Sequence, residues 1–164
     1  HIGISTLIES EDEASELNSI EKDLGIILHN CLSEIYSIND LNSVVTKYKQ
    51  TFLQFQAITE INFQLILHKI VNHQELVNFF NNPSQSFTEK EIMNNKGKCF
   101  RVDRLVFTDA NTCFLLDYKT GAKHISHNIQ LLQYKAILEQ SGVQVKQCYL
   151  VYISTNDINL ELVI

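Results

Sequence analysis

The run Leu115-Leu116-Asp117-Tyr118-Lys119-Thr120-Gly121 does most to set the architecture of this chain. Apolar residues lead into it and a glycine closes it, a pattern that predicts a buried strand ending in a turn. Because strand side chains alternate between faces, Asp117 and Lys119 are expected to project together. A buried carboxylate and ammonium are costly unless they pair or hold a metal, so this strand end is a candidate site.

Two further strands are predicted just before this one. The three β-like runs are Ser86–Met93, Cys99–Phe107 and Cys113–Thr120, separated by turn-forming residues at 94–97 and 108–111. A hairpin of the second and third strands places Asp103 across from or diagonal to Asp117. Two carboxylates on neighbouring strand positions repel each other unless a cation neutralises them.

Helices are predicted on either side of these strands. Apolar spacing of three and four predicts helices from about Ser10 to Tyr36, Asp40 to Phe55 and Glu60 to Phe80. A fourth helix, capped by Ser126 or Asn128, runs to about Gln140, and the runs Lys146–Ile153 and Asn159–Ile164 are again β-like. The expected fold class is therefore α/β, a mixed central sheet with flanking helices and an N-terminal helical portion. We expect one domain over 1–164, mainly helical over 1–82 and β-rich over 83–164.

The composition of the chain excludes several classes of protein. The 164 residues carry a net charge of −6 and are 45% hydrophobic, which excludes a disordered chain. No apolar run approaches the ~20 residues of a membrane span, so no membrane partner is expected. The four cysteines form no CxxC pair, so neither a zinc site nor an iron–sulfur cluster is predicted, and a reducing, cytoplasmic location is favoured. The chain begins at His1 and its single methionine is Met93, so we expect a fragment of a longer polypeptide.

Several motifs follow one another in a recognisable order. They are Gly25-x3-His29, a glutamate near residue 89, Val102-Asp103-Arg104, Asp117-Tyr118-Lys119-Thr120-Gly121 and Gln130-x3-Tyr134. From Gly25 to about Ser154 the chain resembles the PD-(D/E)XK superfamily and its RecB-like nuclease domain. The likeness is greatest to the C-terminal nuclease domain of AddA- or RecB-type helicase–nucleases, which are UvrD-like. The resemblance implies a restriction-endonuclease-like fold.

The resemblance also implies roles for individual residues. The metal ligands would be His29, Asp103, Asp117 and the backbone carbonyl of Tyr118. Lys119 would be the catalytic lysine, and Gln130 and Tyr134 would lie beside the active site and the DNA. Glu89 matches the glutamate common on the first strand, with Glu91 as a rival. Because backbone charge dominates nucleic-acid affinity, the expected phosphate contacts are Arg101, Arg104 and Lys123.

The implied activity is that of a metal-dependent DNA exonuclease, a phosphodiester hydrolase acting in double-strand break repair and recombination. Carboxylates with an imidazole suit Mg²⁺ or Mn²⁺ as the cofactor. The chain has no GxxxxGK[ST] motif, so ATP would act only through helicase motor domains elsewhere in the parent polypeptide. The implied partners are DNA, mainly single-stranded ends, and a second, AddB-like subunit.

Other interpretations stay open at the level of sequence. A lone histidine on an apolar helix, such as His29, is commonly a core residue, while Gln130 and Tyr134 could simply pack, and Glu89 could be solvated. The whole domain could be a degenerate module that binds DNA or a partner without cutting. It could also be a stand-alone RecB-like exonuclease of the CRISPR-associated kind, although those carry cluster-binding cysteines at a spacing that this chain lacks.

Overall fold

The computed structural model describes residues 22–53, 60–81, 85–154 and 157–164. A helix over residues 22–34 comes first and is followed by a short 3-10 turn, Ile38–Asp40. The remaining elements, in chain order, are α2 (Leu41–Leu53), α3 (Glu60–Val71), the 3-10 helix η2 (Val77–Phe80), β1 (Ser86–Met93), β2 (Cys99–Phe107), β3 (Thr112–Thr120), α4 (Ile125–Gln140), β4 (Gln144–Ile153) and β5 (Ile158–Leu162). The predicted order of helices, three strands, one helix and two strands is confirmed.

The five strands form one mixed sheet in the order β1-β2-β3-β4-β5. β1, β2 and β3 are a meander of antiparallel hairpins, and β5 is antiparallel to β4. Only β3 and β4 run parallel, and α4 makes the crossover between them. The α/β class predicted from the sequence, a mixed sheet with flanking helices, is therefore confirmed.

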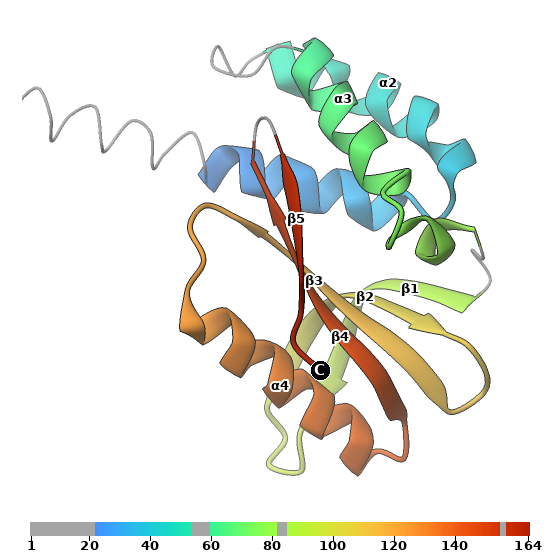
Figure 1. Ribbon diagram of the computed structural model, residues 1–164, viewed down its shortest axis with the longest axis vertical. Coiled ribbons are helices and arrows are strands. Elements are labelled where there is room, and N and C mark those ends of the chain that lie inside the picture. Colours follow the sequence, from blue (N-terminus) through green and yellow to red (C-terminus); the bar gives the residue numbers. More distant parts are fainter. Residues whose placement is uncertain (1–21, 54–59, 82–84, 155–156) are drawn as a thin grey trace, which may run out of the picture.

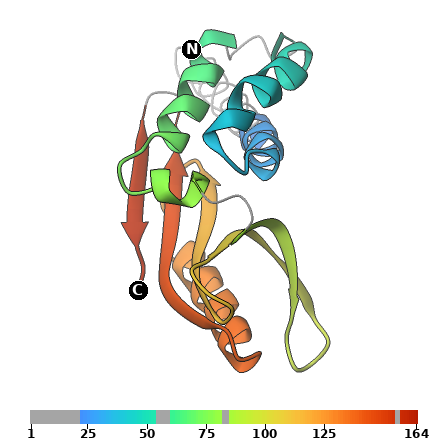
Figure 2. The ribbon, with the colours of Figure 1, turned by 90° about the vertical axis from the view of Figure 1, so that its right-hand side faces the viewer.

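The sheet separates two layers of helix. The helix over 22–34, α2 and α3 group together on one side, and α4 lies apart from them on the other (Figures 1 and 2). The first core joins those three helices to sheet residues such as Leu116, Tyr118 and Val151. The second core joins Leu131 and Leu138 of α4 to the opposite face of the sheet. Residues 117–119 of β3 thus lie between the two layers, near a strand end.

Two predicted helix boundaries are corrected, and a third falls outside the described residues. The helix predicted from Glu60 to Phe80 ends at Val71, because the Asn72 side chain donates a hydrogen bond to the carbonyl of His68 and a turn follows. α4 begins at Ile125 rather than after a Ser126 or Asn128 cap, since the His124 ring accepts a hydrogen bond from the backbone of Ser126. α2 ends at Leu53, and the predicted end at Phe55 lies outside the described residues.

The first predicted helix is described only in part. It runs over residues 22–34, so its end falls two residues before the predicted Tyr36, and its predicted start at Ser10 lies outside the described residues. Within the described ranges, no helix is long and apolar enough to cross a lipid bilayer.

Candidate active site

An open groove of about 890 Å³ gathers most of the predicted site residues. It is walled by the helix over 22–34, by β1, β2 and β3, and by α4, so residues far apart in sequence meet there. The predicted residues that line it are His29, Glu89, Arg101, Asp103, Asp117, Lys119, Gln130 and Tyr134. Glu91, the rival of Glu89, lines it as well. Arg104 and Lys123 are not among its lining residues.

Gly25 sets how closely the first helix approaches β3. A Cβ atom added at Gly25 would lie 2.7 Å from the hydroxyl oxygen of Thr120, closer than real side chains come. The absence of a side chain therefore lets the helix lie directly against the end of β3. One turn further along the helix, this places His29 over the strand.

His29 contacts both strands that carry the aspartates. Its Nε2 atom lies 3.1 Å from the carbonyl oxygen of Tyr118, and its Nδ1 atom lies 3.4 Å from Oδ1 of Asp103. The other oxygen of Asp103 accepts a 2.8 Å hydrogen bond from the backbone N–H of Tyr118. The histidine, the first aspartate and the backbone of Tyr118 are thus locked into one hydrogen-bonded unit.

Glu89 completes a cluster of metal-ligating atoms. One ligand atom each from His29, Glu89 and Asp103 lies within 4.8 Å of the others. Asp117 is not part of that cluster, because its carboxylate is buried deeper, at 3% exposure, and faces Lys119. From the sequence, Asp117 was predicted to be a ligand, and the choice between Glu89 and Glu91 as the first-strand glutamate stayed open. In the structure it is Glu89 that lies near the histidine.

Lys119 is held from two sides. Its ammonium nitrogen lies 2.6 Å from Oδ2 of Asp117 and donates a 2.9 Å hydrogen bond to the side-chain oxygen of Gln130. The Gln130 amide in turn donates a 2.8 Å hydrogen bond to the phenol oxygen of Tyr134. The Gln130 and Tyr134 side chains on α4 therefore fix the position of a lysine on β3.

The electrostatics of the groove favour a bound cation. Burial raises the pKa of Asp117 to about 6, and the charge of Asp103 adds to the rise while Lys119 opposes it. Burial alone would lower the pKa of His29, but its hydrogen bond to Asp103 and the charges of Asp103, Asp117 and Glu89 raise it overall. The four carboxylates of the groove, Glu89, Glu91, Asp103 and Asp117, therefore share a space in which only some of their charge is balanced.

The donor set fits a divalent ion. Among the residues that the structure describes, Oδ2 of Asp117 is the one buried side-chain oxygen or nitrogen without a hydrogen-bond partner, since Lys119 approaches it at ion-pair distance but outside hydrogen-bond geometry. Carboxylate oxygens, a carbonyl and an imidazole are ligands that Mg²⁺ and Mn²⁺ accept. His29, Glu89 and Asp103 are the residues placed to hold such an ion, with the Tyr118 carbonyl and Asp117 beside them.

The three predicted phosphate contacts lie in different settings. Arg101 is exposed at the groove, with its Nε 2.7 Å from a carboxylate oxygen of Glu89. The prediction for Arg104 is wrong, because its side chain is fully buried and bound to the protein interior. Lys123 is exposed but pairs with Glu161 at 3.1 Å, away from the groove, and its role stays a prediction.

Other residues that line the groove were not predicted from the sequence. Ile26, Asn30 and Ser33 share the helix face of His29, and each lines the groove. Their spacing of three and four from one another was the available signal, because such residues lie on one helical face. Of these, Ile26 is an isoleucine with about half of its surface exposed at the mouth of the site.

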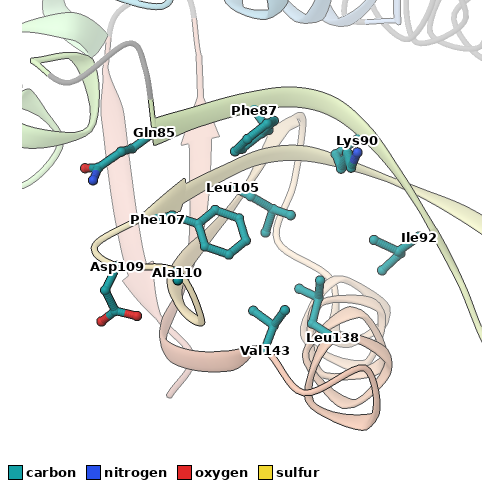
Figure 3. Close-up of a pocket in the computed structure, with 10 residues that line it drawn as sticks. All are labelled: Gln85, Phe87, Lys90, Ile92, Leu105, Phe107, Asp109, Ala110, Leu138 and Val143. Atoms are coloured by element: carbon teal, nitrogen blue, oxygen red, sulfur yellow. The ribbon is translucent and has the colours of Figure 1, made fainter.

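A second, mostly apolar cavity of about 560 Å³ lies between the β1–β2 hairpin and the end of α4 (Figure 3). Phe87, Phe107 and Leu138 point into it, with Lys90 and Asp109 at its margin. The Asp109 carboxylate is occupied by the backbone of its own turn, where it accepts hydrogen bonds from Asn111 and Thr112. The cavity therefore offers no set of metal-ligating or nucleophilic groups, unlike the groove around His29.

Comparisons with known proteins assign no family. No family model matches the chain, and no curated protein matches it. Among solved structures it is similar to the crystal structure of SSO0001, at 19% identity and a TM-score of 0.36, over 88% of this chain and 74% of that one. A likeness at that level carries no argument about function, which must come from the groove itself.

Proposed function

We propose that this chain is a divalent-metal-dependent nuclease domain that hydrolyses phosphodiester bonds of DNA. The observation that carries the proposal is the pairing of two groups in one groove. A His29–Glu89–Asp103 cluster suited to a metal lies beside a lysine that Asp117 and Gln130 hold in place. Metal-dependent phosphodiester hydrolysis needs both a metal-binding set and a fixed cation near the reacting phosphate.

The roles of the protein groups follow from their positions. A divalent ion held by His29, Glu89 and Asp103 would neutralise phosphate charge and lower the pKa of water. Lys119, restrained by two partners, supplies a positive charge at a fixed point and can orient the attacking water. Gln130 keeps the ammonium directed into the groove, and Tyr134 fixes the amide of Gln130 by accepting its hydrogen bond.

The proposal also covers the substrate, the partners and the cofactor. The motif order resembles the RecB-like exonucleases, so the substrate we propose is the end of a DNA strand, delivered as a single strand by helicase motor domains outside this chain. An AddB-like second subunit, a role in double-strand break repair and a cytoplasmic location are part of that proposal. Mg²⁺ or Mn²⁺ is the proposed cofactor, and exposed Arg101 is the proposed contact for phosphate.

The test separates DNA binding from DNA cutting. The wild-type chain and the variants Lys119→Ala and Lys47→Ala are incubated with end-labelled single-stranded and duplex DNA in Mn²⁺. Lys47 is a matched control, because it is also ion-paired, to Glu34 at 2.6 Å, but lies on α2 outside the groove. Loss of a fixed charge at the transition state typically costs about 10²–10³-fold, so Lys119→Ala should bind DNA yet cut at least about 100-fold more slowly.

Two outcomes would contradict the proposal. If Lys119→Ala cuts as fast as the wild type, the lysine has no part in the chemistry. If the wild type binds DNA but never cuts it, even when fused to its helicase, the chain is instead a module that binds without cutting.

A further inference from the structure

Glu89 reaches the metal cluster through an unusual backbone conformation. Its φ is +49°, and it is the one residue other than glycine with a positive φ among those that the structure describes. The β1–β2 pairing includes Thr88 with Arg104 and Lys90 with Val102 but skips Glu89 between them. Such a conformation is unfavourable for a residue with a side chain and is retained where neighbouring contacts impose it.

Contacts of the residue before Glu89 restrain this conformation. The Thr88 hydroxyl donates a 2.7 Å hydrogen bond to the carbonyl of Ser33 and lies 2.9 Å from the phenol oxygen of Tyr36. Both partners belong to the end of the helix that carries His29 or to the turn after it. β1 is thus tied to that helix one residue before Glu89, which directs the glutamate toward the histidine.

The Glu89 carboxylate already forms an ion pair with Arg101. The Nε atom of Arg101 lies 2.7 Å from Oε2 of Glu89, and the two residues sit on neighbouring antiparallel strands. The Arg101 side chain is 68% exposed, whereas that of Glu89 is 30% exposed. Arg101 is therefore the member of the pair that an incoming polyanion can reach.

The charges around the pair oppose one another. Asp103, Asp117 and Glu91 add negative charge to the groove that Glu89 enters, while Lys22 and Lys119 supply positive charge. While Arg101 holds Glu89, a divalent ion must compete with the guanidinium for that carboxylate and is also repelled by it. A phosphate that draws Arg101 away removes both obstacles.

We propose that Arg101 is a latch on the metal site, released by the phosphate backbone of the substrate. Without DNA, the guanidinium pairs with Glu89. When a strand enters the groove, Arg101 transfers to a phosphate oxygen and leaves Glu89 free to ligate the ion. DNA and the divalent ion then bind with positive cooperativity, and by linkage each raises the affinity for the other. This inference rests on the proposed nuclease function and adds a regulation of the same site.

The experiment measures free Mn²⁺ by electron paramagnetic resonance during titration of the whole chain at low, constant ionic strength. Titrations are made with and without a short phosphorothioate single strand, which carries backbone charge but resists cutting. Arg101→Gln is compared with the wild type and with Lys90→Gln. Lys90 is the matched control, because it follows Glu89 on β1 yet lines the apolar cavity instead of the groove.

Without DNA, Arg101→Gln should bind Mn²⁺ about fivefold more tightly than the wild type. This factor corresponds to the free energy of an exposed ion pair at low salt. Addition of the strand should tighten Mn²⁺ binding more in the wild type than in Arg101→Gln, while Lys90→Gln should follow the wild type. Because competition for Glu89 is the larger part of the effect, Arg101→Gln should tighten Mn²⁺ binding less in a Glu89→Gln background than in the wild type.

The outcomes distinguish this inference from the function beneath it. If the wild type binds Mn²⁺ and cuts DNA but Arg101→Gln leaves Mn²⁺ affinity unchanged or weaker, the latch is wrong and the nuclease stands. If the strand tightens Mn²⁺ binding equally in both proteins, the latch is wrong as well. If the wild type binds no Mn²⁺ with or without DNA, the metal site and the latch both fail.

Discussion

Arg104 donates a 3.0 Å hydrogen bond from Nε to the phenol oxygen of Tyr118, and both side chains are buried. The same guanidinium donates to the carbonyls of Leu32 and Ile35 at the end of the first helix and to the hydroxyl of Ser86. It also lies 4.4 Å from the ring centroid of Phe80. Since the backbone of Tyr118 contacts His29 and Asp103, Arg104 braces the candidate site from the side opposite the groove.

Replacement of Arg104 should therefore destabilise the fold severely. Arg104→Met leaves buried carbonyl and hydroxyl oxygens without a donor, and we expect a loss of about 3–5 kcal/mol in the free energy of unfolding. Urea denaturation measures the loss. Exposed Arg101→Met is the control and should change the free energy of unfolding by less than about 1 kcal/mol. A stable Arg104→Met protein that no longer binds DNA would restore the phosphate role predicted from the sequence.

Gly25 should be needed for the placement of His29. In Gly25→Ala the new methyl group meets the Thr120 hydroxyl, so the helix or the Thr120 side chain must shift, at a cost of about 1–3 kcal/mol. Mn²⁺ affinity should fall with stability, because His29 moves with the helix. In a double-mutant cycle with Thr120→Ala, the second change should recover part of both losses. Purely additive losses would show that the close contact is not the cause.

The buried charge of Asp117 should appear as a pH dependence of stability in the metal-free protein. Its pKa is raised from an ordinary value of 3.8 to about 6, so the folded state binds a proton more tightly than the unfolded state does. The resulting stabilisation is complete below about pH 3.8 and is lost as the pH rises through about 6. Asp117→Asn should therefore gain stability relative to the wild type between about pH 4 and 7, by on the order of 2 kcal/mol.

Chemical denaturation in EDTA at several pH values measures that difference. His29, with a raised pKa, contributes in the same direction, and His127, whose pKa burial lowers, contributes in the opposite one. The contribution of His127 is common to both proteins and cancels, whereas that of His29 depends on the Asp117 charge, so the comparison is also made in a His29→Gln background. A difference that does not vary with pH would place the Asp117 carboxylate in a setting more like water than the structure indicates.

Divalent ions should stabilise the fold and their removal should destabilise it. At a Mn²⁺ concentration about ten times Kd, the gain is about 1.4 kcal/mol, which raises the melting temperature by roughly 3–6 °C for a chain of this size. EDTA should reverse the shift, and Asp103→Asn should abolish it. Glu34→Gln, a change outside the groove, should keep it. A shift of equal size in Asp103→Asn would move the ion away from this aspartate.

The sheet could be predicted well because its signals are local. Glycine at 97, the turn-capping Asp109 and alternating apolar residues mark the hairpins, and all three predicted runs before α4 became strands. The pairing of Asp117 with Lys119 on one face follows from strand periodicity alone. Helix ends were less predictable, because the α4 cap is a histidine ring, a choice that capping preferences do not favour.

The site predictions that were wrong or left open concern residues whose positions depend on contacts between distant parts of the chain. Strand alternation puts Arg104 on the face of β2 opposite Arg101 and Asp103, but nothing local shows that this face is covered there, so that Arg104 lies in the core and Arg101 at the surface. The burial of Arg104 depends on the carbonyls at the end of the first helix, about 70 residues earlier in the chain. The choice of Glu89 over Glu91 likewise depends on a positive φ that the sequence does not reveal.

The single parallel pair in the sheet has a consequence for synthesis of the chain. A ribosome that has released only residues up to Thr120 has already made His29, Glu89, Asp103 and Lys119. Gln130, which holds the lysine, and β4, which pairs with β3 across residues 112–120, have still to emerge. Parallel pairing forms late because its connecting segment must close first. The nascent chain therefore carries the acids and the lysine before it can organise them, and the site is completed only after α4 and β4 dock.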